Sequence, residues 1–125
     1  MITALYALPL AALYLFLSIW VVTGRVKTRV SLGDGGDDGL QTRIRTHANF
    51  AEYTPFALVL MLIAEQGGAG APWLHAAGAT LVLARFAHAW GLGLGGPQVA
   101  RGIGYLLSLI AIAIAALAVG LTLRG

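Results

Sequence analysis

Long apolar stretches, separated by short polar or glycine-rich segments, divide the chain into four predicted helices. These stretches cover about residues 2–23, 40–66, 73–91 and 98–123. Each is close to the ~20 residues that a helix needs to cross a ~30 Å hydrocarbon layer. Their apolar runs are continuous and do not alternate with polar residues, which favours helices over a membrane β-barrel. We therefore predict an all-α integral membrane protein, a four-transmembrane-helix bundle formed by residues 1–125 as a single domain.

Residues 24–39 form the predicted connection between the first two helices. Positive charge follows the first apolar run and does not precede it, so we interpret this run as a retained anchor and not a signal peptide. Residues 31–39 contain three aspartates among glycines. Because their spacing is not that of an EF-hand loop, we favour a solvated turn and helix N-cap over a metal site.

Basic residues indicate how the helices cross the membrane. Four of the eight Lys and Arg residues lie in or next to the connection between the first two helices: Arg25, Lys27, Arg29 and Arg43. Arg101 begins the fourth helix, and Arg124 is the one basic residue at the opposite side. The positive-inside rule places residues 24–39 in the cytoplasm and both termini outside. We expect a multi-pass protein of a bacterial inner membrane.

Composition narrows the functional classes further. Hydrophobic residues make up 58% of the chain and charged residues only 10%, whereas soluble domains carry about 25% charged residues. The net charge of +3 is too small and too close to a membrane helix to favour nucleic acid as a partner. There is no cysteine, which excludes disulfides and zinc–thiolate sites. Any thiol chemistry must take its sulfur from a ligand.

A polar stripe interrupts the second apolar helix. Arg45, Asn49 and Glu52 follow i, i+4, i+7 spacing and therefore share one helix face. A carboxylate at membrane depth is costly and normally faces a partner or a wet cavity. We interpret this stripe as a candidate functional site.

Two further helices bring polar residues to the same depth. Arg85 and His88 lie one turn apart near the cytoplasmic end of the third helix, and Arg101 and Tyr105 lie in the opening turns of the fourth. The three arginines outweigh the one nearby acid, Glu52. Such a site favours an anion that also carries an amine or amide donor, such as a small peptide with two carboxylates, because arginine binds carboxylates bidentately.

Structural interpretations of these residues compete with the functional one. Glu52 paired with Arg85 would make an interhelical clamp, and His88 would be a packed, hydrogen-bonded histidine.

Residues near the membrane boundary have further structural explanations. Arg45 and Arg101 would extend to lipid phosphates, and Tyr105 would be an interfacial aromatic. His47 and His75 lie near the interfaces, and we assign them no role.

Residues 45–55 resemble the second-helix signature of the MAPEG superfamily, the membrane-associated proteins of eicosanoid and glutathione metabolism. They match the pattern Arg-x-x-x-Asn-x-x-Glu-Tyr-x-Pro without a gap. Residues 85–88 resemble the third-helix motif of microsomal prostaglandin E synthase, and the intervals to Arg101 and Tyr105 also fit that enzyme. The resemblance covers nearly the whole chain.

The resemblance implies a homotrimer that binds glutathione between neighbouring subunits near the cytoplasmic face. Arg101 would face the sulfur, and it and Tyr105 would be the catalytic residues. Carried over by position, the glutathione-binding residues would be Lys27, Arg45, Asn49, Glu52, Tyr53, Arg85, His88, Arg101 and Tyr105.

The activity implied is that of a glutathione transferase with a peroxidase side activity, as in detoxification. Glutathione would be the cosubstrate and no metal would be needed. The thiolate would attack a hydrophobic electrophile or lipid hydroperoxide that enters from the membrane lipid.

Three positions depart from the family pattern. Leu92 stands where relatives have a glutathione-contacting tyrosine, Gly102 where the prostaglandin enzyme has a serine, and Ala48 where that enzyme has a basic residue. These differences argue against prostaglandin isomerase activity and leave glutathione binding in place.

Two alternatives remain open at the level of the sequence. The first is a non-catalytic glutathione- or lipid-binding membrane protein, because the family includes a lipid-presenting member without enzymatic activity. The second is a small multidrug-type transporter, which depends on a glutamate in its first helix. The first helix here contains no acid, which counts against the transporter.

Overall fold

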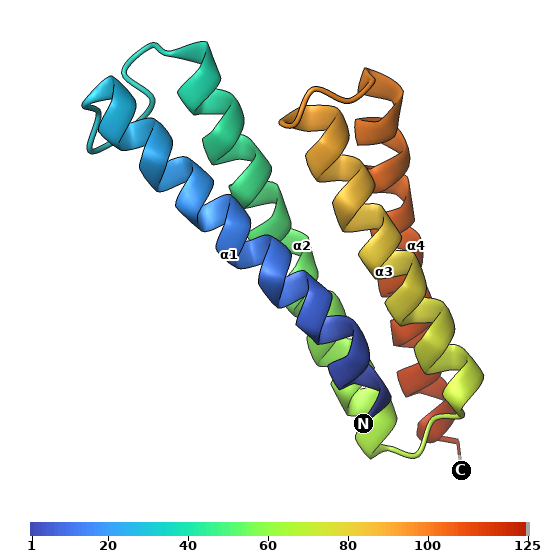
Figure 1. Cartoon of the computed structure of the whole chain (residues 1–125). Coiled ribbons are helices and arrows are strands. Elements are labelled where there is room, and N and C mark those ends of the chain that lie inside the picture. The colour runs from blue at the N-terminus through green and yellow to red at the C-terminus, as the bar shows by residue number, and fades with distance from the viewer. Residues whose placement is uncertain (125) are drawn as a thin grey trace.

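Four helices make up the protein in a computed structural model that describes residues 1–124 (Figure 1). Their bounds are α1 Ile2–Thr28, α2 Asp38–Gln66, α3 Ala71–Leu92 and α4 Gln98–Thr122. The predicted all-α four-helix fold is confirmed. The N-terminus, the end of α4 and the α2–α3 turn lie at one end of the bundle, and the other two connections lie at the opposite end.

α1 continues about one turn beyond the predicted limit of its apolar run. Its last turn carries Arg25 and Lys27, which are favourable there because the C-terminal end of a helix is partially negative. Arg25 Nη1 also donates to the Gly33 carbonyl at 2.8 Å and so holds the following loop. The helix ends at Thr28 and is capped by Arg29, whose φ of 58° is left-handed. The connection is therefore residues 29–37 and not 24–39, because backbone hydrogen bonding continues where the apolar run stops.

Arg43 joins α1 to α2 near this loop. Its Nη1 donates to the Trp20 carbonyl at 2.7 Å and to Thr23 Oγ1 at 3.1 Å, and its guanidinium lies 5.1 Å from the centre of the Trp20 ring. Gly24 makes room for it, because a Cβ there would lie 2.8 Å from Arg43 Cδ. One of the basic residues that predicted a cytoplasmic loop is therefore also a structural link between helices.

At the other end of the bundle, Glu65 of α2 caps the first turn of α1. The Glu65 carboxylate accepts hydrogen bonds from the backbone amides of Ile2 and Thr3. The first amides of a helix have no partner within the helix, and Met1 provides no side-chain cap. Glu65 supplies the missing acceptor from the neighbouring helix.

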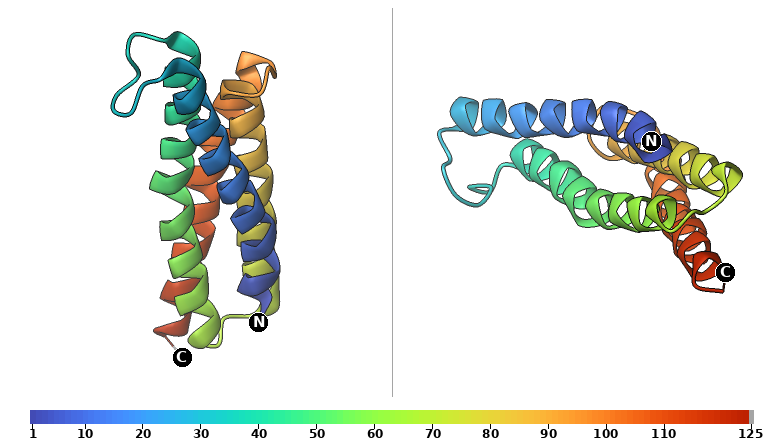
Figure 2. Two further views of the ribbon diagram at one scale, coloured as in Figure 1. Left: turned by 60° about the vertical axis from the view of Figure 1, so that its left-hand side comes forward. Right: turned by 90° about the horizontal axis from the view of Figure 1, so that it is seen from below.

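The helices lie as two pairs, α1 beside α2 and α3 beside α4 (Figure 2). The pairs diverge toward the end that carries the loops 29–37 and 93–97 (Figure 1). α3 and α4 approach most closely, and glycine permits this. A Cβ on Gly104 would lie 2.4 Å from the backbone nitrogen of His88, and a Cβ on Gly91 would lie 2.2 Å from that of Arg101.

The apolar surface of the bundle fits a lipid environment. Large apolar side chains such as Leu8, Ile19 and Leu117 are more than half exposed, which would be unfavourable in water. Among the described residues, α1 and α4 are long and apolar enough to cross a membrane on length and composition. α2 and α3 fall short of that measure because they carry the polar residues of the candidate site.

Candidate functional site

Two neighbouring cavities open between α2 and the facing ends of α3 and α4. They have volumes of about 230 Å³ and about 420 Å³, and they share Asn49, His88 and Arg101. The first is lined by Gln41, Thr42, Arg45, Asn49, His88, Leu92 and Arg101. The second is lined by Asn49, His88, Gln98, Arg101, Gly102 and Tyr105. The fold thus brings polar residues of three helices together.

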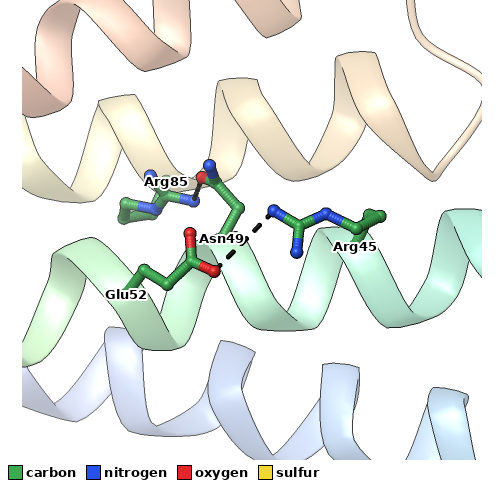
Figure 3. A network of polar contacts seen from close by, with 4 residues as sticks. All are labelled: Arg45, Asn49, Glu52 and Arg85. Atoms are coloured by element: carbon green, nitrogen blue, oxygen red, sulfur yellow. Dashed lines mark hydrogen bonds and ion pairs between the residues drawn. The ribbon is translucent and has the colours of Figure 1, made fainter.

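The polar stripe on α2 is a real cluster. Arg45 Nη2 lies 3.7 Å from Glu52 Oε1, and both side chains are about half exposed (Figure 3). This ion pair agrees with the prediction that positions 45, 49 and 52 share one helix face. An exposed pair of this kind contributes only about 0–1 kcal/mol to stability, so both groups remain available to a ligand.

Arg85 has a different environment from the predicted one. It is 1% exposed and lines neither cavity. Its Nη2 donates to Asn49 Oδ1 at 2.6 Å, and its Nη1 donates to Ser108 Oγ at 2.9 Å. The Glu52–Arg85 clamp considered from the sequence is therefore wrong: Glu52 pairs with Arg45, and Arg85 pairs with Asn49 (Figure 3). Through Asn49 and Ser108, both neutral acceptors, Arg85 links α2, α3 and α4.

The charge of Arg85 is buried without a carboxylate within 4 Å among residues 1–124. Burying an unpaired charge is costly. Partial compensation comes from its two acceptors and from the Phe50 ring, whose centre lies 5.7 Å from the guanidinium carbon. The positive potential of this group adds to that of Arg45 and Arg101 around the cavities.

His88 and Arg101 form the wall shared by the two cavities. His88 is 3% exposed, and its Nδ1 has no hydrogen-bond partner among the described residues. Arg101 lies in the first turn of α4 and is exposed. Tyr105, one turn further, is 44% exposed and meets Tyr53 edge-on with ring centres 5.8 Å apart. A ligand in the cavities can therefore reach an imidazole, a guanidinium and a phenol.

Lys27 does not join this cluster within one chain. It lines a separate cavity of about 130 Å³ between the end of α1 and the start of α2, beside Asp37 and Arg43. Tyr53 lies against Tyr105 but lines neither of the two main cavities. A role for Lys27 at the site requires a second chain.

Several site residues were missed from the sequence. Gln41 lies one turn before Arg45 on the same face, so extending the α2 stripe backward by four positions would have found it. Thr42 and Gln98 gave no comparable signal. Ser108 lies three residues beyond Tyr105, within an apolar stretch of α4, and a lone hydroxyl in such a stretch indicates a buried polar contact.

The arrangement suits a small anion with several polar groups. Arg45 and Arg101 line the cavities directly, Arg85 supports them from beneath, and Glu52 is the one acid among these residues. No group of three or more His, Cys, Asp or Glu residues that could hold a metal ion occurs in the described part of the chain.

Comparison with known proteins shows which family this chain belongs to. The family model described as "MAPEG family" matches residues 3–121.

The chain belongs to the MAPEG family.

Its similarity to curated proteins agrees with this assignment. The MAPEG chain is 44% identical over 91 residues to "Inner membrane protein YecN" of Escherichia coli strain K12, covering 73% of this chain and 70% of that protein. The same protein from Escherichia coli O6:H1 strain CFT073 matches equally well. The name of these relatives states a location and no reaction.

Membership confirms the resemblance predicted from residues 45–55 and 85–88, and with it the membrane bundle. Membership of this family supports a membrane protein with a role related to glutathione or eicosanoids.

Proposed function

We propose that this MAPEG protein binds glutathione in the cavities between α2, α3 and α4 and activates its thiol. The thiolate then attacks hydrophobic electrophiles or lipid hydroperoxides. The observation that carries the proposal is the position of Arg101, which lines both cavities together with Asn49 and His88, in a chain of this family.

Binding follows from the charges in and beside the cavities: Arg45 and Arg101 line them, whereas Glu52 lines neither cavity and lies next to Arg45. The guanidinium groups of Arg45 and Arg101 offer bidentate donors for the two carboxylates of glutathione. Glu52 is half exposed beside Arg45 and can accept the ammonium of the γ-glutamyl residue. On binding, the exposed Arg45–Glu52 ion pair, which contributes little to stability, would be replaced by several charge-assisted hydrogen bonds to the ligand.

Activation requires that the site favour the thiolate over the thiol. A free thiol of this kind has a pKa of ~8.5, and each unit of depression takes ~1.4 kcal/mol of preferential thiolate stabilisation. A guanidinium beside the sulfur supplies part of it. The partially positive N-terminal end of α4, which begins at Gln98, acts in the same direction. The Tyr105 hydroxyl is a further donor within reach of the second cavity.

The chemical steps need no metal. In transfer, the thiolate forms a bond to an electrophilic carbon and the leaving group departs with its electron pair. In peroxide reduction, the thiolate attacks the terminal oxygen and the lipid leaves as an alcohol after taking a proton. The resulting sulfenic acid condenses with a second glutathione to give the disulfide and water.

A homotrimer would complete this site. The cavities open on the surface of one chain, and Arg101, Tyr105 and Glu52 are exposed there. A neighbouring copy in a cyclic assembly covers such residues and could bring its own Lys27 to the ligand. The hydrophobic second substrate would then reach the sulfur from lipid through the cleft between subunits.

Glu52→Leu is expected to weaken trimer assembly or glutathione binding, because the ammonium of the ligand and the guanidinium of Arg45 lose their acidic partner. Crosslinking in detergent and calorimetric titration with glutathione measure the two effects. Glu52→Gln keeps the side-chain shape and is expected to be less severe. A Glu52→Leu protein with wild-type trimer stability and full affinity would exclude this role.

The proposed topology has both termini outside and the site near the cytoplasmic face. A reporter fused after Arg124 is therefore expected to register as external, and one inserted in the loop 29–37 as cytoplasmic. We expect this orientation because basic residues are concentrated at the loop end of the bundle. The opposite pattern of signals would move the site to the other face of the membrane.

Binding of glutathione by the purified protein in detergent tests the proposal directly. Saturating glutathione is expected to produce ultraviolet thiolate absorbance near neutral pH. Turnover is expected with halogenated aromatics or lipid hydroperoxides.

A non-catalytic glutathione- or lipid-binding protein is the second candidate. Leu92 and Gly102 both line the cavities, so the two departures from the family pattern remove hydroxyls from the site itself. Binding without thiolate absorbance or turnover would favour this candidate. Membership of the MAPEG family argues against a small multidrug-type transporter.

A further inference from the structure

We propose that Arg85 and Ser108 form a positioning relay that turns the amide nitrogen of Asn49 into the site. Asn49 then donates to a carboxylate or carbonyl oxygen of the ligand and does not receive its ammonium group. The inference rests on the proposed function and assigns a ligand group to one side chain of that site.

The orientation of the Asn49 amide follows from its contact with Arg85. A guanidinium has only donors, and Arg85 Nη2 lies 2.6 Å from the Asn49 amide. The contacting atom must therefore be the carbonyl oxygen Oδ1. A flipped amide would set two donors against each other and leave the buried Arg85 nitrogen without its acceptor. The amide oxygen and nitrogen have nearly the same shape, so the donor character of Arg85 decides which of them faces it.

The free end of the amide consequently faces the ligand. Asn49 lines both cavities, and its amide nitrogen has no acceptor among residues 1–124. An NH₂ group in that position recognises oxygen. An ammonium at the same point would face a donor and, behind it, the guanidinium of Arg85.

Ser108 holds Arg85 in the position that makes this possible. Ser108 is 0% exposed, and its hydroxyl donates to the Gly104 carbonyl at 2.8 Å. A hydroxyl has one proton, so the Ser108 oxygen faces Arg85 Nη1 as an acceptor at 2.9 Å. The relay therefore runs from α4 through the buried guanidinium of α3 to the amide on α2.

For glutathione, this orientation divides the polar groups between two neighbours on α2. Asn49 takes an oxygen of a carboxylate or peptide carbonyl, and Glu52, one turn further on, is left for the ammonium. The buried guanidinium strengthens the preference for oxygen, because no carboxylate within 4 Å in the described chain neutralises it.

Asn49→Asp tests the donor assignment. Aspartate keeps an acceptor for Arg85, so the protein is expected to fold with a melting temperature at or above that of the wild type. It replaces the NH₂ group with a second acceptor oxygen, so the dissociation constant for glutathione is expected to rise about tenfold or more, as loss of a charge-assisted hydrogen bond predicts. Unchanged affinity in a folded Asn49→Asp protein would overturn the assignment.

Ser108 variants test the relay. Ser108→Ala is expected to weaken glutathione binding several-fold, and Ser108→Thr is expected to restore it, because threonine keeps a hydroxyl that bonds back to its own helix. Thr122→Ala is the matched control: its hydroxyl also bonds to its own helix, at the Val119 carbonyl, but contacts no guanidinium. A purely structural role for Ser108 would lower the melting temperature while leaving affinity unchanged, and that result would overturn the relay.

A ligand-free measurement separates this inference from the proposed function. Asn49→Ala and Ser108→Ala are combined, and thermal unfolding is followed in detergent without glutathione. Because both residues act on Arg85, the double variant is expected to lose less stability than the sum of the single losses. Additive losses would overturn the relay whatever the ligand. Coupled losses with no glutathione binding by the wild type would instead overturn the proposed function, together with the ligand group assigned to Asn49.

Discussion

Replacing Arg101 with alanine is expected to raise the pKa of the bound glutathione thiol by one unit or more and to slow the reaction at neutral pH about tenfold or more, since one unit corresponds to ~1.4 kcal/mol. The pKa of the thiol rises because the positive guanidinium stabilises the thiolate, so its removal leaves less thiolate at pH 7. The rate is expected to recover partly at higher pH. Binding should weaken only modestly, because Arg45, Asn49 and Glu52 remain.

The pH–rate profile is the measurement that decides this prediction. Arg101 is exposed, so its loss is not expected to unfold the protein, and a drop in rate can be assigned to the site. Arg101→Lys is expected to keep part of the activity, because a positive charge remains although the planar fork is lost. An unchanged profile in Arg101→Ala would exclude Arg101 as the thiolate partner and make His88 or Tyr105 the next candidate.

Gly104→Ala is expected to destabilise the protein and abolish glutathione binding, although it adds a single methyl group. That carbon would lie 2.4 Å from the backbone nitrogen of His88 and 2.7 Å from the Ala84 carbonyl oxygen, and backbone cannot move aside as a flexible side chain can. Overpacking of this kind costs about 1–3 kcal/mol, which exceeds the gain of up to about 1 kcal/mol from replacing glycine within a helix. Separating α3 from α4 also moves Arg101 and Tyr105 away from His88.

Gly120→Ala is the matched control for this prediction. Gly120 lies in the same helix, and apart from its chain neighbours and the backbone of its own helix no atom lies within 4 Å of an added Cβ. The melting temperature of the Gly120→Ala protein in detergent is expected to equal or exceed that of the wild type. If Gly104→Ala matches Gly120→Ala in both melting temperature and glutathione affinity, close approach of α3 and α4 is not required for the site.

The sequence by itself determined the four helices, the membrane class and the family. These properties are local or cumulative: an apolar run of sufficient length gives a membrane helix whatever surrounds it. The i, i+4, i+7 spacing of Arg45, Asn49 and Glu52 fixed their common face, because helical geometry is the same in every fold. The end of α1 was misjudged because a helix can continue beyond the membrane on backbone hydrogen bonds alone.

Only the tertiary structure decided which polar groups meet. The sequence placed Arg85 at the right depth but not its rotation relative to α2 and α4, so its partners are Asn49 and Ser108 and not Glu52. Lys27 has the right depth as well, yet lies on the α1–α2 side of the chain. Depth follows from distance along a helix, whereas contact depends on how helices rotate and approach one another. At Gly104 that approach depends on the absence of a single side chain.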